Sequence, residues 1–355
     1  MADPAPVALT MGEPAGIGTE IALKAYARLS DAPPGGAPVF FLIDDPARVE
    51  KIVRLVGLDL RLATIERPAD AESVFPRALP VLPVEAGGDA LLHVEPGAPT
   101  SATAPSVIAS IEMAVRHALS GEASGVVTLP IQKKTLTEAG FAHPGHTEYL
   151  GALTAEAALP RGFARGPVMM LSAGSFRVVP VTIHTPLRAV PDALSVDLIV
   201  RTGLTASQSL IRDFGIGRPR LVIAGLNPHA GEGGTIGTEE QDVIAPAIEA
   251  LRERGVDAMG PFPADTLFHE EARRQYDAAL CMYHDQALVP IKTLAFYDAV
   301  NVTLGLPIVR TSPDHGTALE IAGKGAARPD SLIGAIYAAA GMAKARAGYA
   351  EATEE

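Results

Sequence analysis

The sequence contains a single cysteine, Cys281, so no disulfide bond can form within the chain. It also lacks an excess of basic residues, because 29 Lys and Arg against 41 Asp and Glu give a formal net charge of -12. A nucleic-acid surface needs a net basic stripe that displaces counterions from phosphates. No apolar run has the length of a membrane span, and no basic segment leads into a short apolar one. We therefore expect a cytoplasmic protein that binds neither nucleic acid nor membrane.

The residues that are abundant indicate a large folded protein. The chain is 48% hydrophobic, with 34 Gly and 30 Pro, which suits packed domains with many tight turns. Single cores seldom grow beyond about 250–300 residues, so 355 residues predict two lobes with a cleft. Short runs rich in Val, Ile and Leu alternate with helix-period segments, a rhythm typical of α/β proteins with a largely parallel sheet. For example, residues 6–11 predict a strand, 12–18 a Gly-rich turn, and 19–29 a helix capped by Thr19.

Three strand candidates end in a histidine, namely His184 after "VVPVTI", His229 after "LVIAGLNP" and His284 after "AALCMY". Ligands of α/β sheets gather at the carboxyl ends of strands, and three neutral imidazoles form a suitable site for a catalytic divalent metal. The alternative is three separate histidines that hydrogen-bond at the starts of loops. The repeated context, with Asp285 directly after the third histidine, favours the metal site.

A fourth histidine, His146, precedes Thr147 at the start of a predicted helix. Such a helix terminus offers free N–H groups and the positive end of the helix dipole to an anion. Alternatively, Thr147 is only the helix cap, with Glu148 in the first turn. Taken alone, the motif favours the cap.

Charged and polar residues also interrupt an apolar stretch near the third histidine. Lys292, Asn301 and Arg310 lie there, where unpaired charges would be costly. A phosphate or carboxylate of a substrate could pair with them, with Arg310 binding at two points and Lys292 acting as a point charge. Pairing with Asp298, Asp314 or solvent explains them equally well.

Glycine-rich segments offer close backbone approach to a ligand. The strings "GEPAGIG" at 12–18 and "AGEGGTIGTEE" at 230–240 fit neither the G-x-G-x-x-G pattern nor the P-loop. A standard Rossmann dinucleotide site is therefore unsupported. A nicotinamide cofactor would have to be held differently, and the segment 314–331 offers glycines and a histidine after a strand, unless it is a plain connecting loop.

Several long strings resemble one enzyme family: "MGEPAGIG", "GHTEYL", "GLNPHAGEGGTIGTEE", "MYHDQALVPIK" and "VNVTLGLPIVRTSPDHGTALEIAGKG". Together and in this order, they are similar to the 4-hydroxythreonine-4-phosphate dehydrogenase family of pyridoxal phosphate biosynthesis. The resemblance covers nearly the whole chain. One departure is Thr19, which stands where the family pattern "GIGPE" has proline.

The resemblance implies a homodimer of two-lobed α/β/α subunits with an isopropylmalate dehydrogenase-like fold. We expect a first lobe from 1–140 plus 305–355 and a second from 141–304. The implied cofactors are NAD or NADP and one divalent ion (zinc, magnesium or cobalt), in a cleft that the partner subunit completes. The implied ligands are His184 and His229 of one subunit with His284 of the other for the metal, His146, Thr147, Lys292, Asn301 and Arg310 for the substrate, and His315 and Gly316 for the cofactor.

The implied reaction is oxidation of the 3-hydroxyl of 4-phosphooxy-L-threonine to a 3-keto acid, which loses carbon dioxide to give 3-amino-2-oxopropyl phosphate. Asp265, Asp285 and Lys292 are candidates for the general base, and the sequence does not rank them. A rival within the class is a dehydrogenase of 4-phosphoerythronate or 4-phosphothreonate. Outside the class, a metal-dependent phosphatase and a non-catalytic binder of metal or phosphate remain alternatives.

Overall fold

The structure is a computed structural model, and it describes residues 4–33, 36–86 and 88–354. The chain divides into two compact units, Met1–Ala158 with Pro307–Lys344, and Leu159–Leu306 with Ala345–Glu355. These units do not coincide with the ranges expected from the sequence, because residues 141–158, which include His146 and Thr147, belong to the first unit. In the part of the chain that the structure describes, no helix is both long and apolar enough to span a bilayer.

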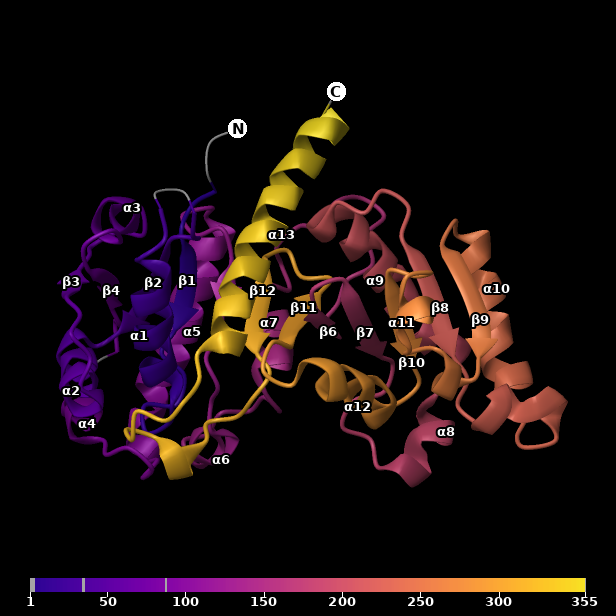
Figure 1. The fold of residues 1–355 in the computed structure, drawn as a ribbon, viewed down its shortest axis with the longest axis horizontal. Helices are drawn as coiled ribbons and strands as arrows, with labels where there is room; N and C mark the ends of the chain where they lie inside the picture. The colour runs from indigo at the N-terminus through magenta and orange to yellow at the C-terminus, as the bar shows by residue number, and fades with distance from the viewer. Residues whose placement is uncertain (1–3, 34–35, 87, 355) are drawn as a thin grey trace. The chain divides into compact units, whose positions relative to one another are not determined.

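The first unit is built on parallel strands whose paired neighbours all run in the same direction (Figure 1). Strands β1 and β2 are buried along their whole length and mostly apolar, which is typical of a sheet covered on both faces. Its strands, in spatial order, are β3 (Leu62–Thr64), β4 (Leu79–Pro83), β2 (Phe40–Asp44), β1 (Val7–Thr10), β5 (Val126–Val127) and β12 (Arg310–Pro313). Its helices are α1 (Gly18–Leu29), α2 (Pro46–Val56), α3 (Asp70–Val74), α4 (Asp89–His93), η1 (Ser101–Thr103), α5 (Ala104–Leu119), α6 (Lys133–Glu138), α7 (His146–Leu153), η6 (Leu319–Ile321) and most of α13 (Asp330–Glu354).

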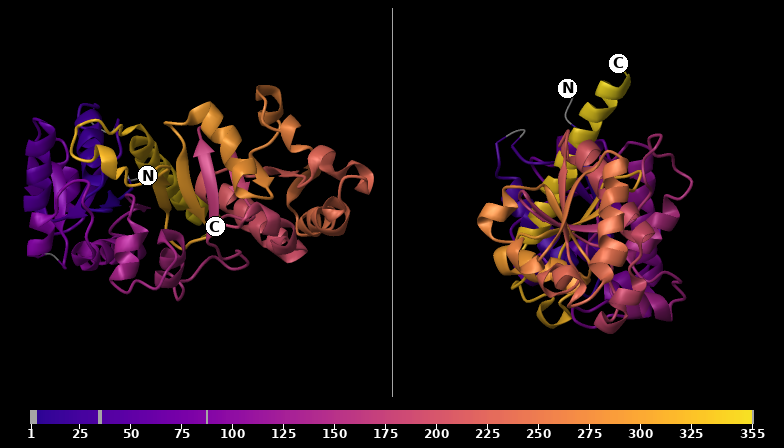
Figure 2. Two further views of the ribbon diagram at one scale, coloured as in Figure 1. Left: turned by 90° about the horizontal axis from the view of Figure 1, so that it is seen from below. Right: turned by 90° about the vertical axis from the view of Figure 1, so that its right-hand side faces the viewer.

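The second unit has a mixed sheet, seen nearly end-on with helices on both sides in the right panel of Figure 2. In spatial order its strands are β11 (Val300–Leu304), β6 (Val168–Ala173), β7 (Phe176–Pro180), β10 (Ala278–Cys281), β8 (Arg220–Ala224) and β9 (Asp257–Phe262). Strand β6 is antiparallel to both neighbours, whereas β7, β10, β8 and β9 run parallel. The carboxyl ends of β7, β10 and β8 therefore lie side by side at one edge.

Helices and short turns connect these strands of the second unit. They are η2 (Leu187–Ala189), α8 (Val190–Ala193), α9 (Val196–Phe214), η3 (Pro228–Gly234), η4 (Glu240–Ile244), α10 (Ala245–Glu253), η5 (Ala264–Thr266), α11 (Glu270–Arg273) and α12 (His284–Ala295). Helix α12 packs on β6, β7 and β10, and α9 packs on β6, β8 and β11. The expected α/β architecture is confirmed.

The expectation that Thr19 caps α1 is wrong. The helix begins at Gly18, and Thr19 lies in its first turn with only 2% of its surface exposed. Its Oγ1 donates to Asp44 Oδ2 over 3.3 Å and accepts from Arg48 Nη2 over 2.5 Å. Asp44 and Arg48 form a buried ion pair of 2.6 Å. The hydroxyl therefore completes a buried polar cluster, which a proline at this position could not do.

Candidate functional site

The three strand-end histidines follow three neighbouring parallel strands of the second unit. His184 follows β7, His284 follows β10 and His229 follows β8, and β10 lies between the other two strands. The imidazole rings of His184 and His284 are 6.2 Å apart between centroids. Both rings line a cavity of about 230 Å³, together with Thr185, Tyr283, Asp285 and apolar side chains from the loop after β7. The topology thus brings the three loops to one edge of the sheet and pairs two of the histidines.

This histidine pair fits one divalent ion. Metal–nitrogen bonds of about 2.0–2.1 Å on both sides of an ion place two imidazole centres roughly 5–6.5 Å apart. Asp285 Oδ1 lies 2.7 Å from His284 Nδ1, so the ring orientation is fixed and Nε2 is left for a ligand. Among the described residues of one chain, no three His, Cys, Asp or Glu side chains already converge on a common point. Within one chain, the described residues therefore supply no closed site of three such ligands.

His229 stands at the start of an unusual backbone segment. Residues 229–233 all have positive φ angles, between 42° and 75°. A left-handed residue other than glycine costs about 1–2 kcal/mol and persists only where the surroundings fix it. Buried Glu240 supplies such a restraint, because its Oε1 accepts hydrogen bonds of 2.7 Å from the N–H groups of both Leu226 and Asn227. The loop that carries His229 is therefore held from within the protein.

The glycines of the segment 230–240 serve this internal packing. A Cβ atom added to Gly231 would meet Glu240 Oε2 at 2.6 Å, and one added to Gly237 would meet the side-chain amide of Asn227. At both glycines the backbone closely approaches polar side chains of the protein itself. The expectation that this string approaches a ligand with its backbone is not needed to explain these two glycines.

The remaining predicted residues of the second unit lie on three different elements. Asp265 is exposed in η5, which contacts the η3 segment that carries His229. Lys292 is half-buried on α12, the helix that His284 begins, and its Nζ lies 5.9 Å from the centre of the Phe296 ring. Asn301 is half-buried on β11, beside β6.

In the first unit, the structure brings His146 and Arg310 into electrostatic contact. Arg310 is only 3% exposed, and its Nε and Nη2 donate to Thr128 Oγ1 over 3.2 and 2.6 Å. Burial lowers the pKa of Arg310 to about 10, while the Glu148 carboxylate opposes this shift. Arg310 therefore stays charged at neutral pH, in a setting where its charge interacts strongly with any nearby anion.

His146 begins α7 and is neutral at neutral pH. Burial lowers its pKa well below the usual range, and the charges of Arg310 and Lys133 add to this shift. Its Nε2 atom is buried and has no hydrogen-bond partner among the residues that the structure describes. Buried polar atoms are nearly always satisfied, so this atom indicates a missing ligand or water. Thr147, the next residue, is half-buried.

Sequence reasoning missed two members of this cluster, Thr128 and Lys133. Thr128 directly follows β5, and Lys133 begins α6 with its Nζ 3.6 Å from the position of an added Cβ on Gly145. The string "TLPIQKK" after an apolar run is a signal of the same kind as the strand-end histidines. Because β1, β5 and β12 are parallel, the segment after β5 emerges at the same edge as the loops after β1 and β12.

The loop after β12 carries the two residues proposed for the cofactor. His315 and Gly316 are exposed, His315 Nδ1 lies 3.0 Å from the Gly316 carbonyl oxygen, and the space beside the Gly316 Cα is open. The segment 12–18 supports this loop, since Ile17 N–H donates to the Thr317 carbonyl over 3.1 Å. Residues 12–18 therefore pack against the loop after β12, while His315 and Gly316 of that loop stay exposed.

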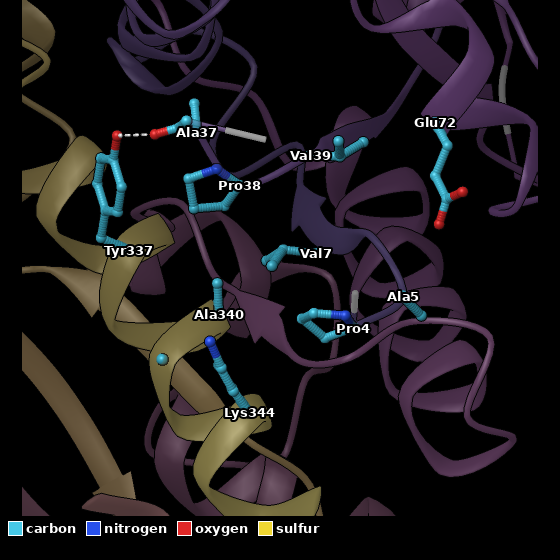
Figure 3. A pocket seen from close by; sticks show the side chains of 12 residues that line it. Pro4, Ala5, Val7, Ala37, Pro38, Val39, Glu72, Tyr337, Ala340 and Lys344 are labelled. Atoms are coloured by element: carbon cyan, nitrogen blue, oxygen red, sulfur yellow. Dashed lines mark hydrogen bonds between the residues drawn. The ribbon is translucent and has the colours of Figure 1, made fainter. Parts of the chain in front are cut away.

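Another cavity, about 440 Å³ in volume, lies in the first unit (Figure 3). It is bounded by residues at the amino ends of β1 and β2 and by α13, where Tyr337 donates to the Gly36 carbonyl over 3.4 Å. Ligands of α/β sheets bind at the carboxyl ends of strands. None of the described residues that line this cavity is a predicted site residue, so the strand-end loops are the better candidate site.

Known proteins resemble this chain over nearly its whole length. The family model described as "Pyridoxal phosphate biosynthetic protein PdxA" matches residues 37–339. A 4-hydroxythreonine-4-phosphate dehydrogenase from Methylorubrum extorquens is 55% identical, covering 94% of this chain and 93% of its own length. One from Caulobacter vibrioides is 53% identical, covering 96% and 98%. The crystal structure of a 4-hydroxythreonine-4-phosphate dehydrogenase from Klebsiella pneumoniae has a TM-score of 0.82 and 35% identity, and it covers 96% of this chain and 99% of its own.

Proposed function

The chain belongs to the PdxA family of pyridoxal phosphate biosynthetic proteins, and on that premise we propose that it oxidises 4-phosphooxy-L-threonine with NAD or NADP. The product would be a 3-keto acid that loses carbon dioxide to give 3-amino-2-oxopropyl phosphate. The observation that carries this proposal is the near full-length similarity to relatives named 4-hydroxythreonine-4-phosphate dehydrogenase. Activity in the cytoplasm remains a prediction from the sequence.

We propose that His184, His229 and His284 hold the divalent ion that this chemistry uses. The position of all three histidines after neighbouring parallel strands and the contact of Asp285 with His284 support this assignment. A bound ion would acidify the substrate hydroxyl and stabilise the negative charge left by decarboxylation. A set of imidazole donors suits zinc better than magnesium, which prefers oxygen ligands.

The cationic cluster of the first unit suits one of the anionic groups of the substrate. Arg310 presents a rigid, buried guanidinium, and Thr128 fixes its orientation through two hydrogen bonds. His146 is neutral and has a buried nitrogen that needs a partner. We propose that these two residues, with Thr147, bind the substrate, and that Lys292 and Asn301 are further substrate ligands.

The contacts of Asp265, Asp285 and Lys292 help to choose between them as the general base. Asp285 is hydrogen-bonded to His284, which favours an orienting role for its carboxylate. Asp265 is exposed beside the His229 segment, and Lys292 is half-buried on the same helix as His284. Asp265 and Lys292 therefore remain the candidates for proton removal from the 3-hydroxyl. A nicotinamide bound near His315 and Gly316 would take the hydride from C3.

We also propose a homodimer whose subunits share the metal site. Large apolar side chains are exposed along α12 and just beyond it, including Val289 at 61% and Phe296 at 66%, with Leu294 and Tyr297 also exposed. Several large apolar side chains exposed on and just after one helix favour an interaction surface. A second copy on this surface would lie against the helix that His284 begins.

The decisive experiment follows nicotinamide reduction at 340 nm with 4-phosphooxy-L-threonine, with and without a chelator. Reduction that needs both the amino acid and the metal supports the proposal. 4-Phosphoerythronate and 4-phosphothreonate are assayed beside it, because a site that binds the substrate amine should reject hydroxyl analogues strongly. Release of phosphate without nicotinamide reduction would instead indicate a phosphatase, and binding without turnover a non-catalytic protein.

A further inference from the structure

The loop between β12 and α13, residues 314–329, is held against α1 by the side chain of Lys24. Lys24 Nζ donates to the Gly325 carbonyl over 2.8 Å, to the Ala327 carbonyl over 2.7 Å and to Glu20 Oε1 over 2.9 Å. An ammonium group has three donors, so these three acceptors use all of them. One side chain therefore ties α1 to a segment that is distant in the sequence.

Glu20 completes this contact, which we call the Lys24–Glu20 clamp. Glu20 Oε1 also accepts from the Ala327 N–H over 3.0 Å, so the two side chains together bind both backbone groups of Ala327. The Glu20 side chain is 1% exposed and the Lys24 side chain 19%, and Ala327 is buried. Solvent does not readily replace bonds in such a setting. The clamp therefore fixes the position of residue 327 relative to α1.

The other limb of the same loop is strained, and the start of α1 binds it as well. Ile17 N–H donates to the Thr317 carbonyl over 3.1 Å, and the next residue, Ala318, has a φ of 43° and a ψ of 53°. A residue other than glycine keeps this left-handed conformation only where its surroundings hold it there. His315 and Gly316 lie directly before this point and are exposed. Both limbs of the segment proposed for the cofactor are thus bound to α1.

We propose that Lys24 is a positioning residue for NAD or NADP, which acts through the loop 314–329 and sets the affinity for the cofactor. This inference rests on the cofactor contacts at His315 and Gly316 in the proposed function. When only a fraction of the protein has its loop in the binding conformation, the apparent dissociation constant rises by the inverse of that fraction. Saturating cofactor restores the binding conformation, so loss of the clamp should raise the KM for the cofactor and leave kcat nearly unchanged.

The same helix offers a matched control in Arg28. Its Nη1 lies 2.8 Å from Asp330 Oδ1 at the start of α13, and 56% of the arginine side chain is exposed. Arg328 binds the same carboxylate, and Arg28 makes no hydrogen bond to the backbone of the loop 314–329 within the part of the chain that the structure describes. Arg28→Met and Lys24→Met each remove one positive charge from α1. The difference between the two variants therefore reports the bonds of the clamp rather than a general electrostatic effect on an anionic cofactor.

The experiment compares the wild-type protein with Lys24→Met and Arg28→Met. Binding of NADH and NADPH is titrated by fluorescence without substrate, and steady-state assays give kcat and both KM values. Loss of one hydrogen bond from a charged group corresponds to a change of about tenfold or more in an equilibrium constant. We therefore expect Lys24→Met to bind the cofactor about 10-fold more weakly and to raise its KM to match, with kcat and the KM for the phosphorylated substrate nearly unchanged. Arg28→Met should behave like the wild type. Equal cofactor affinity in all three proteins, or an equal loss in both variants, would overturn the inference.

A double variant keeps the test valid if Lys24→Met does not fold. Removal of Lys24 alone leaves the Glu20 carboxylate buried without its cation, which is strongly destabilising. Lys24→Met/Glu20→Gln removes both charges and keeps an acceptor for the Ala327 N–H. We expect this protein to melt closer to the wild-type temperature than Lys24→Met and still to bind the cofactor more weakly. A folded double variant with wild-type cofactor affinity would show that the clamp has no role in cofactor binding.

Failure of the proposed function gives a different result. If the wild-type protein binds neither NADH nor NADPH and reduces neither oxidised form, the proposed cofactor is wrong and the inference falls with it. If the wild-type protein binds and reduces the cofactor but Lys24→Met and the double variant do so equally well, the inference alone is refuted and the dehydrogenase activity stands.

Discussion

Replacing Thr128 with valine tests whether the buried guanidinium of Arg310 binds the substrate. The Thr128 hydroxyl accepts from both Nε and Nη2 of Arg310, and valine keeps the shape of the side chain while removing this acceptor. Thr128 and Arg310 are both buried, so solvent does not readily replace the lost bonds. Arg310 should then lose the orientation in which it presents its charge.

The size of the effect follows from these contacts. A hydrogen bond to a charged group contributes about 1.5–3 kcal/mol. Because about 1.4 kcal/mol corresponds to a tenfold change in binding, the full loss would raise the KM for the phosphorylated substrate by roughly 10–150-fold. If the free variant already loses part of this energy, that part lowers its free energy of unfolding and does not change the KM. The calculated factor is therefore an upper bound on the rise in KM.

Steady-state assays of nicotinamide reduction measure the two KM values separately. We expect Thr128→Val to raise the KM for the phosphorylated substrate and to leave the KM for NAD nearly unchanged. Thr128→Ser, which keeps the hydroxyl, should behave like the wild type. The reasoning would be refuted if Thr128→Val lowered the melting temperature but left the substrate KM unchanged, or if Thr128→Ser were equally impaired.

Four other outcomes are expected. Removing divalent metal should abolish turnover and adding zinc or cobalt should restore it, whereas full activity of metal-free protein would contradict the site. His229→Ala should fold with a melting temperature close to that of the wild type but lose turnover by orders of magnitude, and a collapse of the melting temperature would show a structural role instead. Arg310→Lys should raise the KM for the phosphorylated substrate much more than that for NAD, because lysine cannot bind at two points; equal effects would assign Arg310 to the cofactor or the fold. Mixed His184→Ala and His284→Ala dimers should regain about one quarter of wild-type activity after random exchange, since half the dimers are mixed and half their sites are intact; an inactive mixture with exchange shown by mass would place all three histidines in one chain.

Local patterns predicted the strands, the helices and the residues at strand ends. His184, His229 and His284 could be singled out because an apolar run followed by a polar residue marks the end of a strand. The placement of these ends at one edge then follows from parallel packing. The local context also drew attention to His146 and Arg310, but at the helix start it favoured a plain cap, and for Arg310 it left pairing within the protein or with solvent equally open.

The sequence did not reveal side-chain roles that depend on contacts with other elements of the fold. Thr19 has the residue type of a helix cap, but its hydroxyl serves a buried ion pair between β2 and α2, which no local pattern reveals. Gln286 and Glu240 became visible only through backbone groups far away in the sequence, at Gly225 and Leu226. The hydrogen bond from Gln286 to Gly225 depends on β10 and β8 being neighbours, and strand order is not encoded in the periodicity of either strand.

Strand order also bears on which subunit supplies His284. Because β7 and β10 are adjacent, the residues after them must lie close together in one chain, and the His184 and His284 rings do so at 6.2 Å. If the partner supplies His284, then the sheet edge that carries the histidines in one chain must face the corresponding edge in the other chain. The exposed apolar side chains of α12 follow directly after His284 and suit such an apposition. The Asp285 contact would orient His284 equally well toward either chain, so only the mixed dimers separate the two arrangements.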